Sequence, residues 1–337
     1  FSKKKGRNQM LLIFCSKLIG NNKSTLILQE EFKKENILFE IINPHAFVGG
    51  NYALVQKNSE IFLNVSGKRI KPTIIYFANN WRCDSIINIP KCINFPGAYR
   101  MRIYQFMQDI RFAFEDIFWI PGKYESIERG DSKPTVLNLA HSFGLSTPVF
   151  TCNSKYDDNL KNFSERFYKK NLGSPFVISF SKTKGAEVGV TTTNISFDLN
   201  DGIKEEAIFQ PWQWQEPISF VAQVRCFVVN NKIWAAKWNN IAESNESSDY
   251  RYKNQIKKEK IIWSEYKLPA DVSIATIALM KKLSLSIASP EFLLLDDGTH
   301  VFIDLNPTGD WCGFFSEEVN REIILALIET FKPYCFY

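Results

Sequence analysis

The stretch that most constrains the fold of this chain is an acidic hairpin near its C-terminal end, SPEFLLLDDGTHVFIDLNP, residues 289–307. Two apolar runs flank an Asp-Gly pair at 297–298, which is a strong signal for a two-residue turn between antiparallel strands. Counting outward from that turn predicts the opposed pairs along the two strands: Asp296 with Thr299, Leu294 with Val301, Phe292 with Ile303, and Glu291 with Asp304.

Two carboxylates would then face each other across the hairpin, which is unfavourable in a bare sheet. Alternation along the second strand puts Phe302, Asp304 and Asn306 on one face, and Val301, Ile303 and Leu305 on the face toward the core. A cation between the acids would remove the repulsion, and oxygen ligands from two acids and an amide suit Mg²⁺. The pattern predicts a metal site at Glu291, Asp304 and Asn306, and the alternative is an exposed hairpin with solvated acids.

The composition permits more than one packed core and excludes several classes of protein. The chain has 337 residues, of which 45% are hydrophobic, so disorder is not expected. Its net charge of +5, from 41 basic and 36 acidic residues, is compatible with anionic ligands. No dense basic stripe alternates with aromatic residues, so we do not expect nucleic-acid binding.

The seven cysteines are odd in number and never spaced as CxxC, which predicts reduced thiols in a cytoplasmic protein without a zinc site. No apolar run is long enough for a membrane span, so no membrane partner is expected. The basic start, FSKKKGRNQM, predicts that residues 1–9 are a disordered leader or an expression remnant, with Met10 as the natural start.

The order of predicted elements indicates an α/β (α+β) protein. A strand at MLLIFCS, a helix at KSTLILQEEFKKEN and a strand at ILFEIIN form a β-α-β opening with some parallel pairing. Pro and Gly in WIPGKYES suggest a boundary, after which DSKPTVLNLAHSFG predicts a helix with a Ser cap, an early Pro and a Gly stop. We expect an N-terminal domain at 10–122, a central subdomain at 123–207 and a C-terminal subdomain at 208–337.

Hairpins dominate the last part of the chain, beginning with two strands about the Asn230–Asn231 pair. Arg225 lies in the middle of the first strand. A three-residue turn, Asn230 to Lys232, would put Lys237 of the second strand on the same face as Arg225, whereas a two-residue turn would put Lys237 on the opposite face.

Several stretches occur together in an order that resembles the ATP-grasp superfamily. They are DSKPTVLNLAHSFGLSTPVFT, IFQPWQW, AQVRCFVV, SDYRYKN, YKLP and FIDLNPTGDW, and the resemblance covers Trp119 to Gly313. Within the superfamily they resemble the maturases of ribosomally made peptides, the graspetide macrocyclases of the microviridin and grasp-with-spasm type. The resemblance implies an ATP-grasp fold with an N-terminal pre-ATP-grasp α/β domain, a small central domain and a C-terminal antiparallel-sheet domain.

The resemblance also implies roles for individual residues. Catalytic residues would be Arg225, Arg251 and Lys237, and metal ligands would be Glu291, Asp304 and Asn306. Residues that would bind the nucleotide are Lys133, Ser179, Lys182, Lys184, Gln210, Pro211, Trp212, Gln213 and Glu216.

Two departures from the family pattern bear on activity. Ser179 stands where the second nucleotide lysine is expected, so that Lys182 or Lys184 would have to replace it. Pro211 stands where the hinge has an acidic residue, and proline has no N–H to donate.

The activity implied by the resemblance is an ATP- and Mg²⁺-dependent ligase. It would activate side-chain carboxylates of a precursor peptide, with a leader and an acidic core, as acyl phosphates and close ester or amide macrocycles. Because family members often pair, a homodimer is also implied. One alternative is a carboxylate–amine ligase for small molecules or amino acids. The other is a degenerate peptide-binding protein without catalysis, which Ser179 favours.

Overall fold

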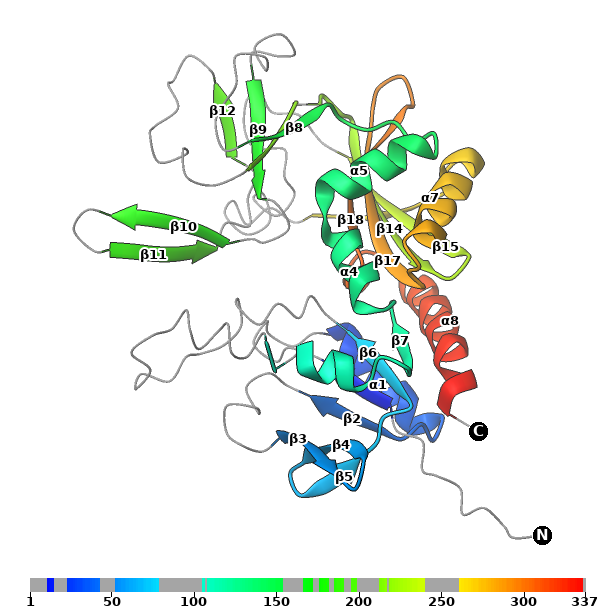
Figure 1. The fold of residues 1–337 in the computed structure, drawn as a ribbon. Coiled ribbons are helices and arrows are strands. Elements are labelled where there is room, and N and C mark those ends of the chain that lie inside the picture. Colours follow the sequence, from blue (N-terminus) through cyan, green and yellow to red (C-terminus); the bar gives the residue numbers. More distant parts are fainter. Residues whose placement is uncertain are drawn as a thin grey trace.

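The residues that the computed structural model describes, most of the chain, form five sheets with flanking helices (Figure 1). The residues it describes are 11–14, 23–42, 52–78, 105–106, 108–153, 166–171, 176–181, 185–190, 195–198, 212–216, 218–239 and 261–335.

The N-terminal sheet is parallel and has the strand order β2-β1-β6-β7. Its elements are β1 (Leu11–Phe14), α1 (Lys23–Lys34), β2 (Phe39–Ile42), β6 (Ile74–Phe77) and β7 (Phe118–Ile120). Helix α1 follows β1 and returns the chain to a parallel neighbour, β2, as the sequence predicted. It buries Leu28 and Phe32, whose spacing of four places both on one side of the helix.

An antiparallel meander between β2 and β6 was not anticipated from the sequence. It consists of β3 (Tyr52–Lys57), β4 (Glu60–Val65) and β5 (Lys68–Ile70). Both of its turns are two residues long, and all four of their residues have positive φ angles between 50° and 85°. Asn58-Ser59 and Ser66-Gly67 are the turn signals that could have revealed it.

Two helices lead from the N-terminal sheet to the rest of the molecule, α4 (Tyr124–Asp131) and α5 (Lys133–Ser142). Helix α5 begins after Ser132, has Pro134 in its first turn and ends before Gly144, whose φ is +85°. The predicted start and stop of the helix are therefore confirmed. Ser132 occupies the N-cap position, but its hydroxyl is hydrogen-bonded to Thr135 Oγ1 and makes no capping bond to a backbone N–H of the helix.

The strands after α5 form two separate sheets. One is a four-stranded sheet with the order β12-β9-β13-β8, and the other is the hairpin β10–β11. Their bounds are β8 (Phe150–Asn153), β9 (Arg166–Asn171), β10 (Phe176–Ser181), β11 (Gly185–Val190), β12 (Ile195–Asp198) and β13 (Trp212–Gln215). Strand β13 pairs with both β8 and β9, although it lies beyond the boundary expected at 207–208. The domain boundaries stay a prediction.

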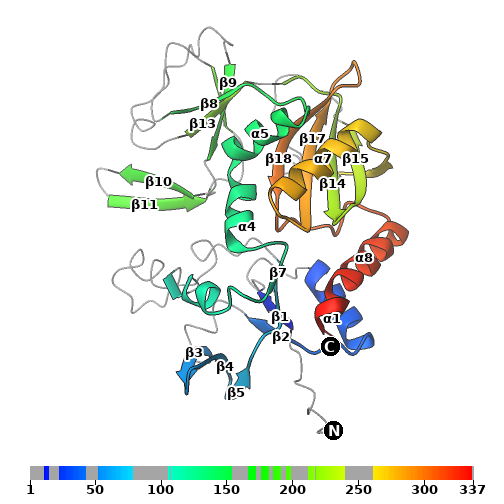
Figure 2. The same cartoon turned by 45° about the vertical axis from the view of Figure 1, so that its right-hand side comes forward.

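The C-terminal sheet is antiparallel and has five strands in the order β16-β15-β14-β17-β18. Its elements are β14 (Ala222–Val229), β15 (Lys232–Asn239), β16 (Ser264–Tyr266), α7 (Ala270–Lys282), β17 (Ile287–Leu294), β18 (His300–Asn306) and α8 (Glu317–Cys335). Figure 2 shows α7 lying in front of this sheet, while α8 runs from it toward α1. Cys226 and Phe292 of the sheet share a buried cluster with Leu279 of α7. This helix therefore covers one face of the sheet.

The β17–β18 hairpin differs from the prediction near its turn. The loop is the three residues Asp296–Gly298, closed by a hydrogen bond from Leu295 N to Thr299 O of 2.9 Å, and Gly298 has a φ of +85°. Leu294 consequently opposes His300 rather than Val301, and Phe292 opposes Phe302 rather than Ile303. The predicted two-residue turn is wrong by one residue because an Asp-Gly pair also closes three-residue loops with Gly in the left-handed conformation.

A β-bulge then restores the predicted pairing at the acids. The register shifts between Phe292 and Glu291, which leaves Ile303 as the extra residue of β18 and sets Glu291 opposite Asp304. The bulge also reverses the alternation of faces. Phe302 lies with the fully buried Phe292 in the core, on the face opposite Asp304, so the expectation that Phe302 and Asp304 share a face is wrong.

No helix among the described residues is long and apolar enough to cross a membrane.

The turn after β18 packs directly on β17, and substitution of Gly309 tests this contact. A Cβ added at Gly309 would overlap Ser289 Cβ and Oγ, so Gly309→Ala should lower the free energy of unfolding by about 1–3 kcal/mol. Ser289→Gly removes the atoms in the way, and we expect the double variant to recover most of the loss. Urea denaturation of the four proteins measures the coupling, and strictly additive effects would contradict the contact.

Candidate functional site

A row of directly opposed residues crosses all five strands of the C-terminal sheet. Asp304 opposes Glu291, Glu291 opposes Arg225, Arg225 opposes Ala236, and Ala236 opposes Glu265. Directly opposed side chains lie on the same face, so this cross-strand row brings two acids and an arginine together. The face is the one opposite α7.

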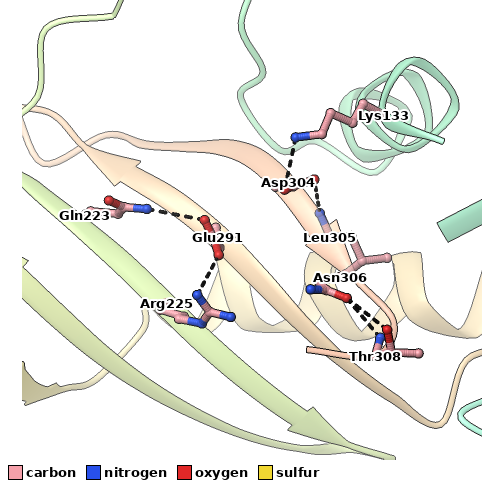
Figure 3. Close-up of polar contacts among 8 residues, drawn as sticks. All are labelled: Lys133, Gln223, Arg225, Glu291, Asp304, Leu305, Asn306 and Thr308. Carbon is pink, nitrogen blue, oxygen red and sulfur yellow. Dashed lines mark hydrogen bonds and ion pairs between the residues drawn. The ribbon is translucent and has the colours of Figure 1, made fainter. Parts of the chain in front are cut away.

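Arg225 is the most buried charged member of the row, with 8% of its surface exposed. Its Nη1 lies 3.0 Å from Glu291 Oε1, and Gln223 Nε2 donates to the other carboxylate oxygen at 3.3 Å (Figure 3). Gln223 is two residues before Arg225 on the same strand and therefore shares its face. The carboxylate of Glu291 is thus held on both oxygens by β14.

Lys133, the first residue of α5, supplies the second positive charge. Its Nζ donates to Asp304 Oδ2 at 3.1 Å, while the backbone N–H of Leu305 donates to Asp304 Oδ1 at 3.1 Å. Helix α4 fixes this placement, because a Cβ at Gly130 would lie 2.6 Å from Pro307 Cγ. The bare backbone of Gly130 lets α4 pack against the residue that follows Asn306, and α5 then begins beside Asp304.

Asn306 completes the predicted metal-ligand set. It opposes Ser289 and follows Asp304 by two residues, so it lies on the face of the acids. Its Oδ1 accepts a hydrogen bond from Thr308 N at 3.0 Å and a long one from Thr308 Oγ1 at 3.4 Å. These bonds hold the amide oxygen of Asn306 toward Thr308, in the turn after β18 (Figure 3).

The donor set fits a hard cation. Among the described residues, no group of three or more His, Cys, Asp or Glu side chains is arranged to hold a metal ion. Glu291, Asp304 and Asn306 instead offer two carboxylates and an amide, and each carboxylate oxygen can accept more bonds than it does here. A small number of oxygen ligands from the protein suits Mg²⁺, because this ion keeps water and phosphate oxygens as its other ligands.

The structure corrects the prediction for Lys237. The β14–β15 turn is two residues long, with Val229 opposite Lys232, so Lys237 opposes Val224 and lies on the face opposite Arg225. Its Nζ lies 5.5 Å from the ring centroid of Tyr266. The alternative with a three-residue turn is therefore wrong. Only that turn would have placed Lys237 beside Arg225, as the predicted catalytic role requires.

The residues predicted at the nucleotide hinge are only partly described. Gln213 of β13 is completely buried, and neither atom of its amide has a hydrogen-bond partner among the described residues. Glu216 accepts a hydrogen bond from Val149 N at 2.9 Å and donates its own N–H to Val149 O at 3.1 Å, which joins the ends of β13 and β8. An unpartnered buried amide such as that of Gln213 is suited to a polar ligand.

Other predicted site residues lie outside the described residues: Lys182, Lys184, Gln210, Pro211 and Arg251. Ser179 and Trp212 are described only as backbone positions of β10 and β13, with Ser179 opposite Glu187.

Two side chains of the site were missed by the sequence analysis. Gln223 had a signal, namely its spacing of two from Arg225, whereas Phe314, whose ring centroid lies 4.2 Å from Arg225 Cζ, had none. Cys226, next to Arg225, is buried on the α7 face, and burial raises the pKa of its thiol. Cys226 therefore stays protonated and does not serve as a nucleophile.

Comparison with solved structures finds close similarity of fold. The macrocyclase MdnC of Microcystis aeruginosa MRC, bound with its precursor peptide MdnA, is 16% identical with a TM-score of 0.72, over 95% of this chain and 100% of that one. A RiPP-associated ATP-grasp ligase of Chryseobacterium gregarium, in complex with ADP and a leader and core peptide, is 16% identical with a TM-score of 0.74, over 96% and 97%.

A third similar structure is the ATP-grasp ligase PsnB, complexed with a phosphomimetic variant of its minimal precursor, Mg and ADP. It is 12% identical with a TM-score of 0.69, over 96% of this chain and 99% of that one. No protein-family model and no curated protein sequence matches the chain. The predicted ATP-grasp fold is confirmed, and the resemblance to the peptide macrocyclases holds at the level of fold.

The two ion pairs of the site differ in burial, and we expect them to differ in stability. Arg225→Ala would leave Glu291, 17% exposed, without its main cation and should lower the free energy of unfolding by about 3 kcal/mol. Lys133→Ala removes a cation from a pair that is 26% and 31% exposed, and we expect a loss of about 1 kcal/mol or less.

Chemical denaturation measures both losses. As a control, the double variant with Arg225→Met and Glu291→Leu should be more stable than Arg225→Ala, because it buries no unpaired charge. Equal losses for Arg225→Ala and Lys133→Ala would contradict the burial difference.

Proposed function

We propose that this chain, which has the ATP-grasp fold, is an ATP-dependent ligase that closes ester or amide rings in a ribosomally made precursor peptide. The observation that carries the proposal is the meeting of Lys133, Arg225, Glu291 and Asp304 on one face of the C-terminal sheet. Two cations and two acids within ion-pair distance suit a polyphosphate with a divalent metal ion. Peptide-bound ligases of the same fold support a peptide as the partner.

The two cations, Lys133 and Arg225, would bind the phosphates of the nucleotide. Lys133 and Arg225 each bond one carboxylate, and both are donors only, so phosphate oxygens would share or replace those partners. Arg225, with its planar fork of donors, suits the transferred phosphoryl group, and Lys133 suits a point contact with the β-phosphate. The buried amide of Gln213 supports a place for the base near β13.

The metal would be bound by the carboxylates of Glu291 and Asp304 once Arg225 and Lys133 bond to phosphate oxygens instead. Glu291, Asp304 and Asn306 would bind Mg²⁺, which when bound supplies positive charge at the β- and γ-phosphates. The ligase PsnB, with Mg and ADP, supports this choice of metal and nucleotide.

The reaction would proceed in two displacements. A side-chain carboxylate oxygen of the peptide forms a bond to the γ-phosphorus of ATP, and the bond from that phosphorus to the bridging oxygen breaks, so ADP leaves. A Ser or Thr hydroxyl or a Lys amine of the same peptide then bonds to the acyl carbon, loses its proton and displaces inorganic phosphate. The protein contributes position and charge, and no protein nucleophile is required.

Several finer points belong to the proposal. The peptide would carry an acidic core, since it supplies the carboxylates, and Arg251 would join Arg225 on the phosphate or the carboxylate. Lys182 or Lys184 would replace the nucleotide lysine absent at Ser179. A homodimer and a cytoplasmic location stay predictions.

Nucleotide binding is testable without knowing the peptide. Mg²⁺ with ADP at about 100 times its Kd should stabilise the protein by about 2.7 kcal/mol, which raises Tm by about 5 °C. We expect Asp304→Asn to abolish this rise while leaving the Tm of the free protein nearly unchanged. Asp296→Asn, an exposed acid in the turn of the same hairpin, is the matched control and should keep the full rise. Loss of the rise in both variants would contradict a site at Asp304.

The activity itself is testable by intact mass. The peptide encoded beside the gene, incubated with the protein, ATP and Mg²⁺, should lose one water per ring, with ADP formed and no change when ATP is left out. An unchanged mass with nucleotide still bound would overturn the proposal in favour of a peptide-binding protein. ADP release stimulated by free amino acids would overturn it in favour of a small-molecule ligase.

A further inference from the structure

The guanidinium group of Arg225 is enclosed from two sides. Glu291 Oε1 lies 3.0 Å from its Nη1, and the ring centroid of Phe314 lies 4.2 Å from its Cζ. Phe314 belongs to the turn between β18 and α8, directly after Gly313, whose φ is +91°. With 8% of its surface exposed, Arg225 has an aromatic ring where a solvent-facing arginine would have water.

The turn that carries Phe314 is tied to the edge of the same sheet. Trp263 meets the Phe314 ring edge to face, with centroids 5.1 Å apart and planes at 77°. Two residues after Phe314, the hydroxyl of Ser316 donates to Glu265 Oε1. Glu265 is the last member of the cross-strand row, so the segment from Phe314 to Ser316 lies along the row from Arg225 toward β16.

The site is therefore asymmetric. Its β17–β18 side presents the carboxylates, Asn306 and Lys133, which are the groups suited to a metal ion and phosphates. Its β14–β16 side is lined by two partly buried aromatic rings, Trp263 and Phe314, which we name the aromatic wall. A guanidinium against an aromatic wall acts in a low dielectric, where its attraction for a phosphoryl group is stronger than in water.

We propose that the aromatic wall is the acceptor side of the ligase site, with Phe314 as a positioning residue. It orients Arg225 and keeps water away from the acyl phosphate formed on the peptide side chain. This inference rests on the proposed function and deepens it.

The competing reaction defines what the wall would prevent. If water reaches the acyl phosphate, its oxygen bonds to the acyl carbon, phosphate leaves, and the carboxylate is regenerated with release of a proton. ATP is then consumed without a ring. Excluding water keeps the acyl carbon available for the hydroxyl or amine of the peptide.

The decisive measurement is the amount of ADP formed per ring closed, from ADP assay and intact mass on the same samples. We expect this ratio to rise several-fold in Phe314→Ala and to stay near the wild-type value in Phe314→Tyr, which keeps the ring. Phe315→Ala is the matched control, because Phe315 is the next residue but packs against the separate core cluster beneath α8. Its ratio should match the wild type.

A second readout needs no peptide. Without the ring, water and salt reach Arg225, so raising KCl from low concentration to about 1 M should weaken binding of Mg²⁺ with a non-hydrolysable ATP analogue, which keeps the γ-phosphate, more in Phe314→Ala than in the wild type or Phe315→Ala. Thermal unfolding of each variant checks that the fold is retained.

The outcomes separate the two proposals. An unchanged ratio and an unchanged salt dependence in Phe314→Ala would overturn the inference while the ring-closing activity stands. Equal effects in Phe315→Ala would mean that Phe314 contributes only to packing, and this result would also overturn the inference. No water loss and no ADP from the wild type would remove the proposed function, and the inference with it.

Discussion

The repulsion between Glu291 and Asp304 is the constraint on which the rest of the site depends. The two carboxylates are directly opposed on neighbouring strands, an arrangement that a sheet does not tolerate without positive charge. Arg225 of β14 and Lys133 of α5 supply that charge from opposite sides. Each of the four charges is thereby stabilised. In the proposed function, phosphate oxygens and Mg²⁺ would replace these partners.

Placing the two cations requires two different kinds of structure. Arg225 reaches Glu291 through strand register, since the β14–β17 ladder sets the two residues opposite each other. Lys133 reaches Asp304 through helix packing, since Gly130 lets α4 lie against Pro307 and α5 starts three residues later. The site thus joins the C-terminal sheet to the helices that lead from the N-terminal sheet.

The candidate site could be predicted in part because its chemistry is carried by residue types at fixed spacing. The pairing of Glu291 with Asp304 was predicted correctly, although the turn from which it was counted was not. A three-residue loop shifted the register by one, and the bulge at Ile303 shifted it back. Nothing in the apolar run VFI, residues 301–303, marks the point of that bulge. The side of the sheet on which Lys237 lies depended in the same way on whether the β14–β15 turn has two or three residues. The turn has two, so Lys237 lies on the face opposite Arg225.

By itself the sequence determined the local features: the parallel β-α-β opening, the start and stop of α5, and a hairpin with opposed acids on its two strands and an amide on the second. These follow from short-range physics, namely side-chain periodicity, capping and the conformational freedom of glycine. The tertiary structure decided which of these polar groups meet. Lys133 and Asp304 are 171 residues apart, and Phe314 reaches Arg225 from a turn with no sequence signal. Contacts of that range depend on how the helices and the sheet pack together, which no local pattern specifies.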